Sequence, residues 1–222
     1  MNILAIDTAL EACSVALSLI GSGRPLARSE PVARGHAERL FGMIEAVLSE
    51  AGLSIPDIDR FAVTIGPGSF TGIRVGIAAV RGFAVVSGAP AVGVSTLAAH
   101  AETAREVVGE KPVLAVLPAK GDEVFGQLFA PDGAEITEAN VGSPGYFAGE
   151  ALRANAVVAG AGSERVVASD GRSHLAVIHS RSTPDINAVL RVAASKSPVG
   201  SPRPLYVKSP DATRVETAVL RR

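Results

Sequence analysis

Residues 61–86 read FAVTIGPGSFTGIRVGIAAVRGFAVV, and the rest of the chain is organised around this stretch. The short apolar run at 61–65 has the composition of a buried strand, and a turn of glycine, proline and serine follows at 66–69. Small and aliphatic residues then continue to Ser87 and Gly88, which predicts a helix that ends there. Backbone N–H groups at a helix N-terminus lack intrahelical partners. Three interpretations are therefore open: a nucleotide loop, a helix that packs against another protein, or an ordinary core β–α unit.

Composition limits the class of protein. With 222 residues, of which 47% are hydrophobic, the chain has enough apolar material for one large domain or two small ones. A formal net charge of −1 provides no overall basic field, so any role with RNA should take its phosphate contacts from a partner. The single cysteine, Cys13, excludes an intrachain disulfide framework, and a buried structural thiol is the simpler interpretation.

Targeting signals are not evident. The N-terminus has no basic region of the signal-peptide kind, and the nearest approach to a membrane helix, at 75–86, is interrupted by Arg81. We therefore expect a cytoplasmic protein without membrane contact.

The order of the predicted elements indicates an α/β fold. Strands are predicted at 2–6, 12–20, 26–32, 61–65 and 91–94. Helices are predicted at 35–51, from the 66–69 turn to Ser87, and from Ser95 to about Val108. Strands that are neighbours first through hairpins and then through helical crossovers form a mixed sheet with helices covering it.

Beyond Gly109 the pattern is weaker, and no internal repeat is evident. Strands are predicted at 113–117, 124–129 and 156–159, and Ile186, Val189, Leu190 and Ala193 mark one amphipathic helix. The proline-rich segment 197–204 should be extended, and 205–208 should be a short strand or a docking segment. We predict two lobes, 1–109 and a smaller 110–222 that ends in an extended, mobile tail.

Catalytic chemistry has little support in the sequence. Asp7 ends the first predicted strand, but the strand at 61–65 offers no second carboxylate, so a two-metal site is not expected. Asp7 is more simply a carboxylate that accepts hydrogen bonds from nearby backbone N–H groups. The four histidines lack metal-ligand spacing, and Ser69 lacks the context of a nucleophile elbow. His36 belongs to the first turn of a helix, with no nucleophile paired to it in sequence.

The sequence of the glycine loop gives only weak evidence for a nucleotide site. A P-loop needs a lysine that is absent here, and the dinucleotide fingerprint needs an acidic residue about 20 positions further on, which is also absent. A secondary nucleotide contact stays open. The residues that would make it are Asp7, Gly66, Gly68, Ser69, Thr71 and Gly72.

The helix that follows the loop is apolar nearly all round. From Gly72 to Ser87, only Arg74, Arg81 and Ser87 are strongly polar. Such a helix is normally buried on more than one side. One side must cover the sheet, and the other is covered either by the preceding helix or by a partner chain.

Several segments together closely resemble one known family. They read ILAIDTA at 3–9, EACSVAL at 11–17, GPGSFTGIRVG at 66–76, GVSTL at 93–97 and PLYVK at 204–208. The family is TsaB (YeaZ), bacterial proteins required for threonylcarbamoyladenosine in tRNA. The resemblance is continuous over about 2–99 and sparse afterwards.

The resemblance implies an actin/Hsp70/sugar-kinase-like fold, with two lobes of ribonuclease-H-like topology and a reduced second lobe. It implies a subunit without catalytic residues, metal or cofactor of its own, which pairs with a TsaD-like catalytic subunit or, when alone, forms a homodimer. A TsaE-like ATPase joins the heterodimer, ATP or ADP could bind at the shared interface, and tRNA is contacted only indirectly. The implied interface residues on the two pairing helices are His36, Leu40, Met43, Val47, Ile73, Arg74, Ile77, Val80 and Arg81.

The competing hypothesis is a stand-alone ATPase or small-molecule kinase of the same fold. It would use Asp7, Thr8 and the glycine turn at 160–162 around the phosphates, but the stretch DTALE at 7–11 lacks the glycine of a phosphate hairpin. The chain also departs from the family at Pro118 and Lys120, where members often carry Asp and Arg.

Overall fold

The computed structural model describes residues 1–21, 23–32, 35–171 and 175–207, so the tail predicted to be mobile lies outside the described residues. The first of two sheets has the strand order β3-β2-β1-β4-β5. Its strands are β1 (Ile3–Asp7), β2 (Ala12–Ser18), β3 (Leu26–Pro31), β4 (Arg60–Thr64) and β5 (Ala91–Val94). β1 pairs antiparallel with β2 and parallel with β4, which confirms the predicted mixed sheet.

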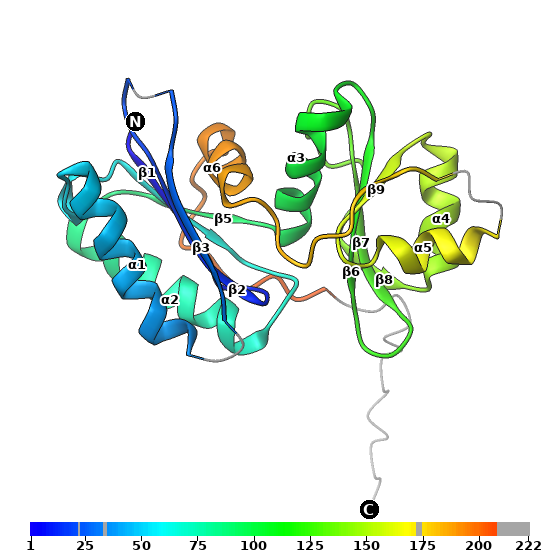
Figure 1. Cartoon of the computed structure of the whole chain (residues 1–222), viewed down its shortest axis with the longest axis horizontal. Helices are drawn as coiled ribbons and strands as arrows, with labels where there is room; N and C mark the ends of the chain where they lie inside the picture. Colours follow the sequence, from blue (N-terminus) through cyan, green and yellow to red (C-terminus); the bar gives the residue numbers. More distant parts are fainter. Residues whose placement is uncertain (22, 33–34, 172–174, 208–222) are drawn as a thin grey trace, which may run out of the picture.

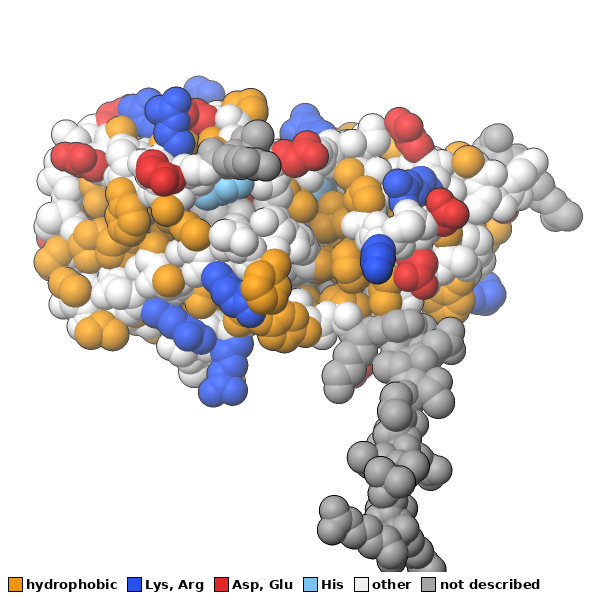
Figure 2. All heavy atoms as spheres, turned by 90° about the horizontal axis from the view of Figure 1, so that it is seen from below, with side chains coloured by type: hydrophobic (Ala, Val, Ile, Leu, Met, Phe, Trp, Pro, Cys, Tyr) orange, Lys and Arg blue, Asp and Glu red, His pale blue; other side chains and the backbone are white. Residues whose placement is uncertain are grey.

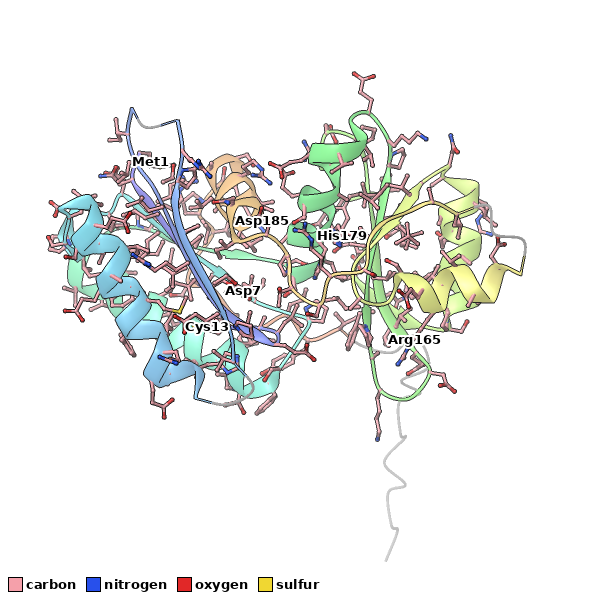
Figure 3. The ribbon with its side chains drawn as sticks, viewed as in Figure 1. Met1, Asp7, Cys13, Arg165, His179 and Asp185 are labelled. Atoms are coloured by element: carbon pink, nitrogen blue, oxygen red, sulfur yellow. The ribbon has the colours of Figure 1, made fainter. Side chains whose placement is uncertain are left out.

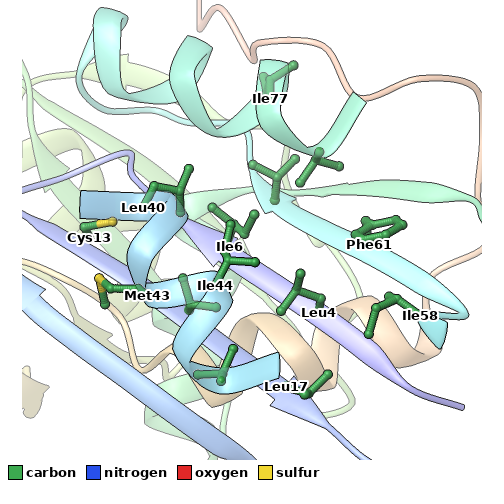
Figure 4. Packing of buried hydrophobic residues seen from close by; sticks show 14 of the residues in the cluster. Leu4, Ile6, Cys13, Leu17, Leu40, Met43, Ile44, Ile58, Phe61 and Ile77 are labelled. Atoms are coloured by element: carbon green, nitrogen blue, oxygen red, sulfur yellow. The ribbon is translucent and has the colours of Figure 1, made fainter. Parts of the chain in front are cut away.

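Two helices, α1 (His36–Ala51) and α2 (Phe70–Ser87), cover one face of this sheet (Figure 1). α1 ends before Gly52, which has φ 66° and donates its N–H to the last carbonyls, the left-handed geometry that glycine adopts at helix ends. A 3-10 turn, η1 (Ile55–Asp57), leads into β4. Aliphatic side chains from the sheet and both helices form one core beneath them, among them Leu4, Ile6, Leu40, Ile44 and Ile77 (Figure 4).

The second sheet repeats this connectivity, with the order β10-β9-β6-β7-β8. Its strands are β6 (Val113–Pro118), β7 (Val124–Phe129), β8 (Asn140–Gly142), β9 (Val157–Ala159) and β10 (Val177–His179). Helices α4 (Pro144–Arg153) and α5 (Ser163–Asp170) cover it, as α1 and α2 cover the first. The two sheets of equivalent strand order, each covered by helices, agree with the predicted two-lobed, actin/Hsp70/sugar-kinase-like architecture. Three strands of the second sheet have only three residues each, so the second lobe is the reduced one.

The two remaining helices of the described residues lie between the sheets (Figure 1). Each follows a strand of one sheet in the sequence but packs on the other sheet. α3 (Thr96–Val108) follows β5 of the first sheet, yet Leu97 belongs to a core with Val113 of the second. α6 (Ile186–Ser195) follows β10, yet Val189 packs with Ile3 of the first sheet. The predicted division at 109–110 falls between α3 and β6, whereas α6 returns to the first lobe.

Polar contacts join these exchanged helices. The buried Glu102 carboxylate of α3 accepts from Arg105 Nη1 at 2.6 Å and from Arg191 Nε of α6 at 2.9 Å. Arg191 Nη1 also pairs with Glu106 at 2.8 Å. A largely buried carboxylate held by two guanidinium groups is costly to separate, so this contact fastens one lobe to the other.

Two histidines meet at the same junction. His179 lies at the end of β10 (Figure 3). Its ring lies 5.4 Å from the ring of His100 on α3, and His179 Nε2 is 3.3 Å from the His100 carbonyl oxygen. His100 is fully buried, and neither of its ring nitrogens has a hydrogen-bond partner among the described residues. Burial lowers the pKa of His100 to about 3 and also lowers the pKa of His179. Both rings are therefore neutral near pH 7.

We expect the free energy of unfolding to fall as the pH drops below about 6.5, the ordinary pKa of histidine in an unfolded chain. Between that pH and about 3, His100 is protonated in the unfolded chain and neutral in the folded chain. This histidine alone should contribute a slope of about 1.4 kcal/mol per pH unit. The variant His100→Phe should flatten the profile without abolishing it, because His179 titrates in the same direction. Urea unfolding at pH 7.5, 6.5 and 5.5 measures the slope, and an unchanged slope in the variant would contradict the assignment.

Candidate functional site

The glycine loop, residues 66–69, docks on the end of β1. Ser69 N donates to the Ala9 carbonyl oxygen at 2.7 Å, and Thr8 Oγ1 donates to the Gly72 carbonyl oxygen at 2.7 Å. Ser69 also caps α2, because its Oγ accepts from Gly72 N at 3.2 Å. The loop therefore begins α2 in a fixed position against the sheet.

The glycines at 68, 72 and 76 are required by this docking. A Cβ atom on Gly72 would lie 2.0 Å from the Thr8 carbonyl oxygen, and one on Gly68 would lie 2.2 Å from the Ala9 carbonyl oxygen. On Gly76 it would lie 2.6 Å from Thr8 Oγ1. The backbone of Thr8 and Ala9 thus occupies the inner side of the loop, which a phosphate would need. Gly160, after β9, meets the Val116 carbonyl oxygen in the same way.

Asp7 is an internal tie at the end of β1 (Figure 3). Its buried carboxylate accepts from Ala9 N at 2.9 Å and from Thr64 Oγ1 at 2.6 Å. Burial raises the pKa of Asp7, and these two hydrogen bonds oppose the rise only in part. This is the hydrogen-bonded carboxylate that the sequence predicts, and it gives no support to a phosphate-binding role.

Metal and thiol chemistry have no evident location. Within residues 1–21, 23–32, 35–171 and 175–207, no three His, Cys, Asp or Glu side chains are grouped so that they could hold a metal ion. Cys13 lies in the core of the first lobe. Burial, and then the charges of Asp7 and Glu30, raise the pKa of its thiol to about 11, so the unreactive thiol form prevails.

A cavity of 420 Å³ opens beside the loop, between the lobes. His36 lines it, with Nε2 3.2 Å from the Leu10 carbonyl oxygen, and Glu11 brings a carboxylate. Its other walls are mostly apolar, with Pro118 and Phe125 from the second lobe, while Lys120 is exposed to solvent. An acidic group and apolar walls are poor surroundings for a nucleotide phosphate.

The predicted interface residues divide into two sets. His36 is half-buried, and Arg74 and Arg81 are exposed. The other side chains are buried in the core beneath α1 and α2 (Figure 4), namely Leu40, Met43, Val47, Ile73, Ile77 and Val80. These six hold the lobe together, and the surface available to a partner is made by their neighbours on the helices.

That outer surface, which we call the helix-pair face, carries the exposed apolar side chains of α1 and α2. Phe41 of α1 is 54% exposed and stacks edge-on against Phe83 of α2, with ring centroids 6.2 Å apart. Val85 and Val86 are exposed at the end of α2. The exposed small residues of this face are Gly42, Ala78 and Gly82. Figure 2 shows apolar side chains gathered over this half of the molecule.

Large apolar side chains that are exposed together, as Phe41, Val85 and Val86 are, are typical of interaction surfaces. By length and composition alone, α2 could cross a membrane, with 18 residues and a third of them buried. Its buried side packs on the sheet with Ile73 and Ile77, however, as in the core helix of an α/β protein.

The glycine requirement can be tested on α2 itself. Gly72→Ala should lower the free energy of unfolding by at least about 3 kcal/mol, because the new methyl group meets backbone that cannot move aside. Gly82→Ala is the matched control: nothing lies within 4 Å of its Cβ position, so it should raise stability by about 0.5–1 kcal/mol. Urea unfolding of both variants gives the comparison. Equal effects would show that the close approach to Thr8 is not a constraint.

Comparison with known proteins identifies similar chains. A sequence model of the family described as TsaD, tRNA N6-adenosine threonylcarbamoyltransferase, matches residues 29–145. The tRNA threonylcarbamoyladenosine biosynthesis protein TsaB of Escherichia coli (strain K12) is 44% identical over 125 residues, which are 56% of this chain and 53% of that protein. The protein of the same name in Haemophilus influenzae is 38% identical over 125 residues. The chain thus spans about half the length of the curated relatives it matches.

A solved structure extends the similarity to the second lobe. YeaZ from Pseudomonas aeruginosa is 32% identical, with a TM-score of 0.79, and the match covers 93% of this chain and 99% of that chain. The two-lobed fold is therefore shared over nearly the full length of both proteins.

Proposed function

The chain belongs to the TsaB (YeaZ) family, and we propose that it serves the formation of threonylcarbamoyladenosine in tRNA as a non-catalytic scaffold subunit. In this proposal it binds a TsaD-like catalytic subunit and promotes the transfer of the threonylcarbamoyl group to N6 of the adenosine by that subunit. The observation that carries the proposal is the helix-pair face, whose aromatic and aliphatic side chains are exposed in the single chain.

The chemistry of this face suits a stable protein contact. Exposed Phe and Val side chains gain about 25 cal/mol for each Å² of apolar surface that a partner buries, before the costs of association. The glycines and alanine among them let a second helix approach closely, and the edge-on pair of Phe41 and Phe83 joins α1 and α2 into one rigid surface. A polar group on the partner would find few hydrogen-bond partners there, so the partner should present an apolar helix face.

The match to the TsaD family supports the choice of partner. The matched residues, 29–145, include α1 and α2, so a protein of that family has the counterparts of both helices. Two related helix pairs can pack about an approximate two-fold axis and form four helices in one contact. The same geometry would pair two copies of this chain, which we propose as the homodimer formed when the catalytic subunit is absent.

A non-catalytic role agrees with the interior of the site. Asp7 is engaged by Thr64 and Ala9, and the loop glycines are occupied by packing against β1. We propose that a TsaE-like ATPase joins the heterodimer, that ATP or ADP binds at the shared interface, and that tRNA is reached through the catalytic subunit in the cytoplasm.

The interface is tested by two matched valine variants. Val86→Glu on the helix-pair face should abolish co-purification with the catalytic subunit, because a partner would bury its charge. Val107→Glu is the control: Val107 is 76% exposed near the end of α3, compared with 74% for Val86 near the end of α2. It should bind normally. Both variants should unfold at the parent's urea midpoint.

A reconstituted tRNA modification assay supplies the functional readout. Modification should require this chain, persist with Val107→Glu and be lost with Val86→Glu. Retained binding by Val86→Glu would overturn the interface. Modification that proceeds equally well without this chain would overturn the proposed function.

A further inference from the structure

Arg74 lies between two exposed aromatic rings at the start of α2. Its guanidinium carbon is 3.2 Å from the centroid of the Phe70 ring, and its Nη2 donates to Tyr206 Oη at 2.8 Å. Phe70 is 66% exposed and Tyr206 is 63% exposed. Arginine, tyrosine and phenylalanine are residue types enriched in protein interfaces, and arginine and tyrosine often provide much of the binding energy.

The Tyr206 ring is brought there by a segment we call the C-terminal strap, residues 202–206. The strap is fixed at two other points, because Arg81 Nε donates to the Pro202 carbonyl oxygen at 3.0 Å and Leu205 N donates to the Ile65 carbonyl oxygen at 2.8 Å. The strap therefore has two anchors besides the hydrogen bond between Arg74 and Tyr206. The charge of Arg74 is available for another purpose.

A cavity of 170 Å³ adjoins this arginine. Ile73 and Leu205 are part of its apolar lining, Phe125 reaches it from the second lobe, and Phe70 and Tyr206 complete it beside Arg74. The cavity has room for about one aliphatic side chain. Its apolar lining and the single lining cation, Arg74, make it a small site of mixed character.

Three arginines lie at the cavity or at the strap: Arg74 lines the cavity, Arg81 donates to Pro202, and Arg203 belongs to the strap. In the described part of the chain, no carboxylate lies within ion-pair distance of Arg74, Arg81 or Arg203. Figure 2 shows Lys and Arg side chains beside apolar ones along this edge of the first lobe. A partner that approaches here is favoured when it carries negative charge.

We propose that Phe70, Arg74 and Tyr206 form a receptor for an acidic residue of the partner protein, with an apolar side chain next to it in the 170 Å³ cavity. The planar guanidinium fork matches a carboxylate, and the flanking rings exclude water from the pair. The apolar lining favours a protein carboxylate over the phosphates of RNA, which bring no aliphatic group for the cavity. The inference rests on the proposed function, since the partner is the catalytic subunit that binds the helix-pair face.

The test is calorimetric titration of the full chain with the purified catalytic subunit. Arg74→Gln should weaken binding about 10- to 100-fold, because it removes a charge-assisted hydrogen-bonded pair. The affinity of Arg74→Lys should fall between those of the parent and Arg74→Gln, since lysine keeps the charge but lacks the guanidinium fork. Arg153→Gln is the matched control: it removes a 67% exposed arginine from α4 of the second lobe, outside the cavity and the helix-pair face, and should bind within about threefold of the parent.

Each outcome separates the two proposals. If Arg74→Gln binds like the parent while Val86→Glu does not, the receptor is wrong and the proposed function stands. If Arg153→Gln is as weak as Arg74→Gln, the loss of affinity is not specific to the position of Arg74 and the receptor is again wrong. If Arg74→Gln lowers the affinity for free tRNA and leaves the subunit affinity unchanged, the ligand is a phosphate instead. If the parent does not bind the subunit, both proposals fail.

Discussion

The close approach of the Thr8 and Ala9 backbone to the glycine loop is the constraint on which the rest of this structure depends. Only glycine leaves room for those carbonyl oxygens at 68 and 72, and the hydrogen bonds from Ser69 and Thr8 then fix the first turn of α2. Because α2 cannot shift, its aliphatic side faces the sheet and α1 packs beside it. The outer side chains of both helices are consequently presented to solvent in one rigid arrangement. The loop that resembles a phosphate site in sequence therefore serves to pack the start of α2 against the end of β1.

The second lobe contains a similar close contact between a glycine and a strand backbone, made by different residues. Gly160 follows β9 and approaches Val116 of β6, as the first loop approaches the end of β1. The strand order, the pairing directions and the positions of the covering helices are repeated as well. The sequence shows no such repeat because connectivity and close backbone contacts can persist while side chains change.

The sequence predicts the first lobe nearly completely, since all of its strands except β3 carry apolar runs and its helices end at Gly52, Gly88 and Gly109. It misses β8, β10, α4 and α5. Strands of three residues are too short for periodicity to reveal. α5 has only eight residues, and α4 contains Gly145 and Gly149, which weaken a helix prediction. The amphipathic pattern of α6 indicates a buried face but not which sheet buries it. For α2, a helix that is apolar nearly all round gives no signal for which side faces inward, so its selected interface residues included three that are buried, Ile73, Ile77 and Val80. On α1 the selected Leu40, Met43 and Val47 belong to the apolar face that packs on the core.

The exchange of α3 and α6 has a consequence for biosynthesis. The first sheet is complete once Val94 has left the ribosome, but the helix that covers its second face begins only at Ile186. At a synthesis rate of about 5–20 residues per second, the second face of the sheet stays exposed for several seconds before α6 is made. Ala5, Ala16 and Ala62 contribute much of it, and such small side chains expose little apolar surface to misassociation during the delay. The nascent chain therefore matures as a single unit, and a fragment cut between the lobes would leave each sheet without a helix that belongs to the other half.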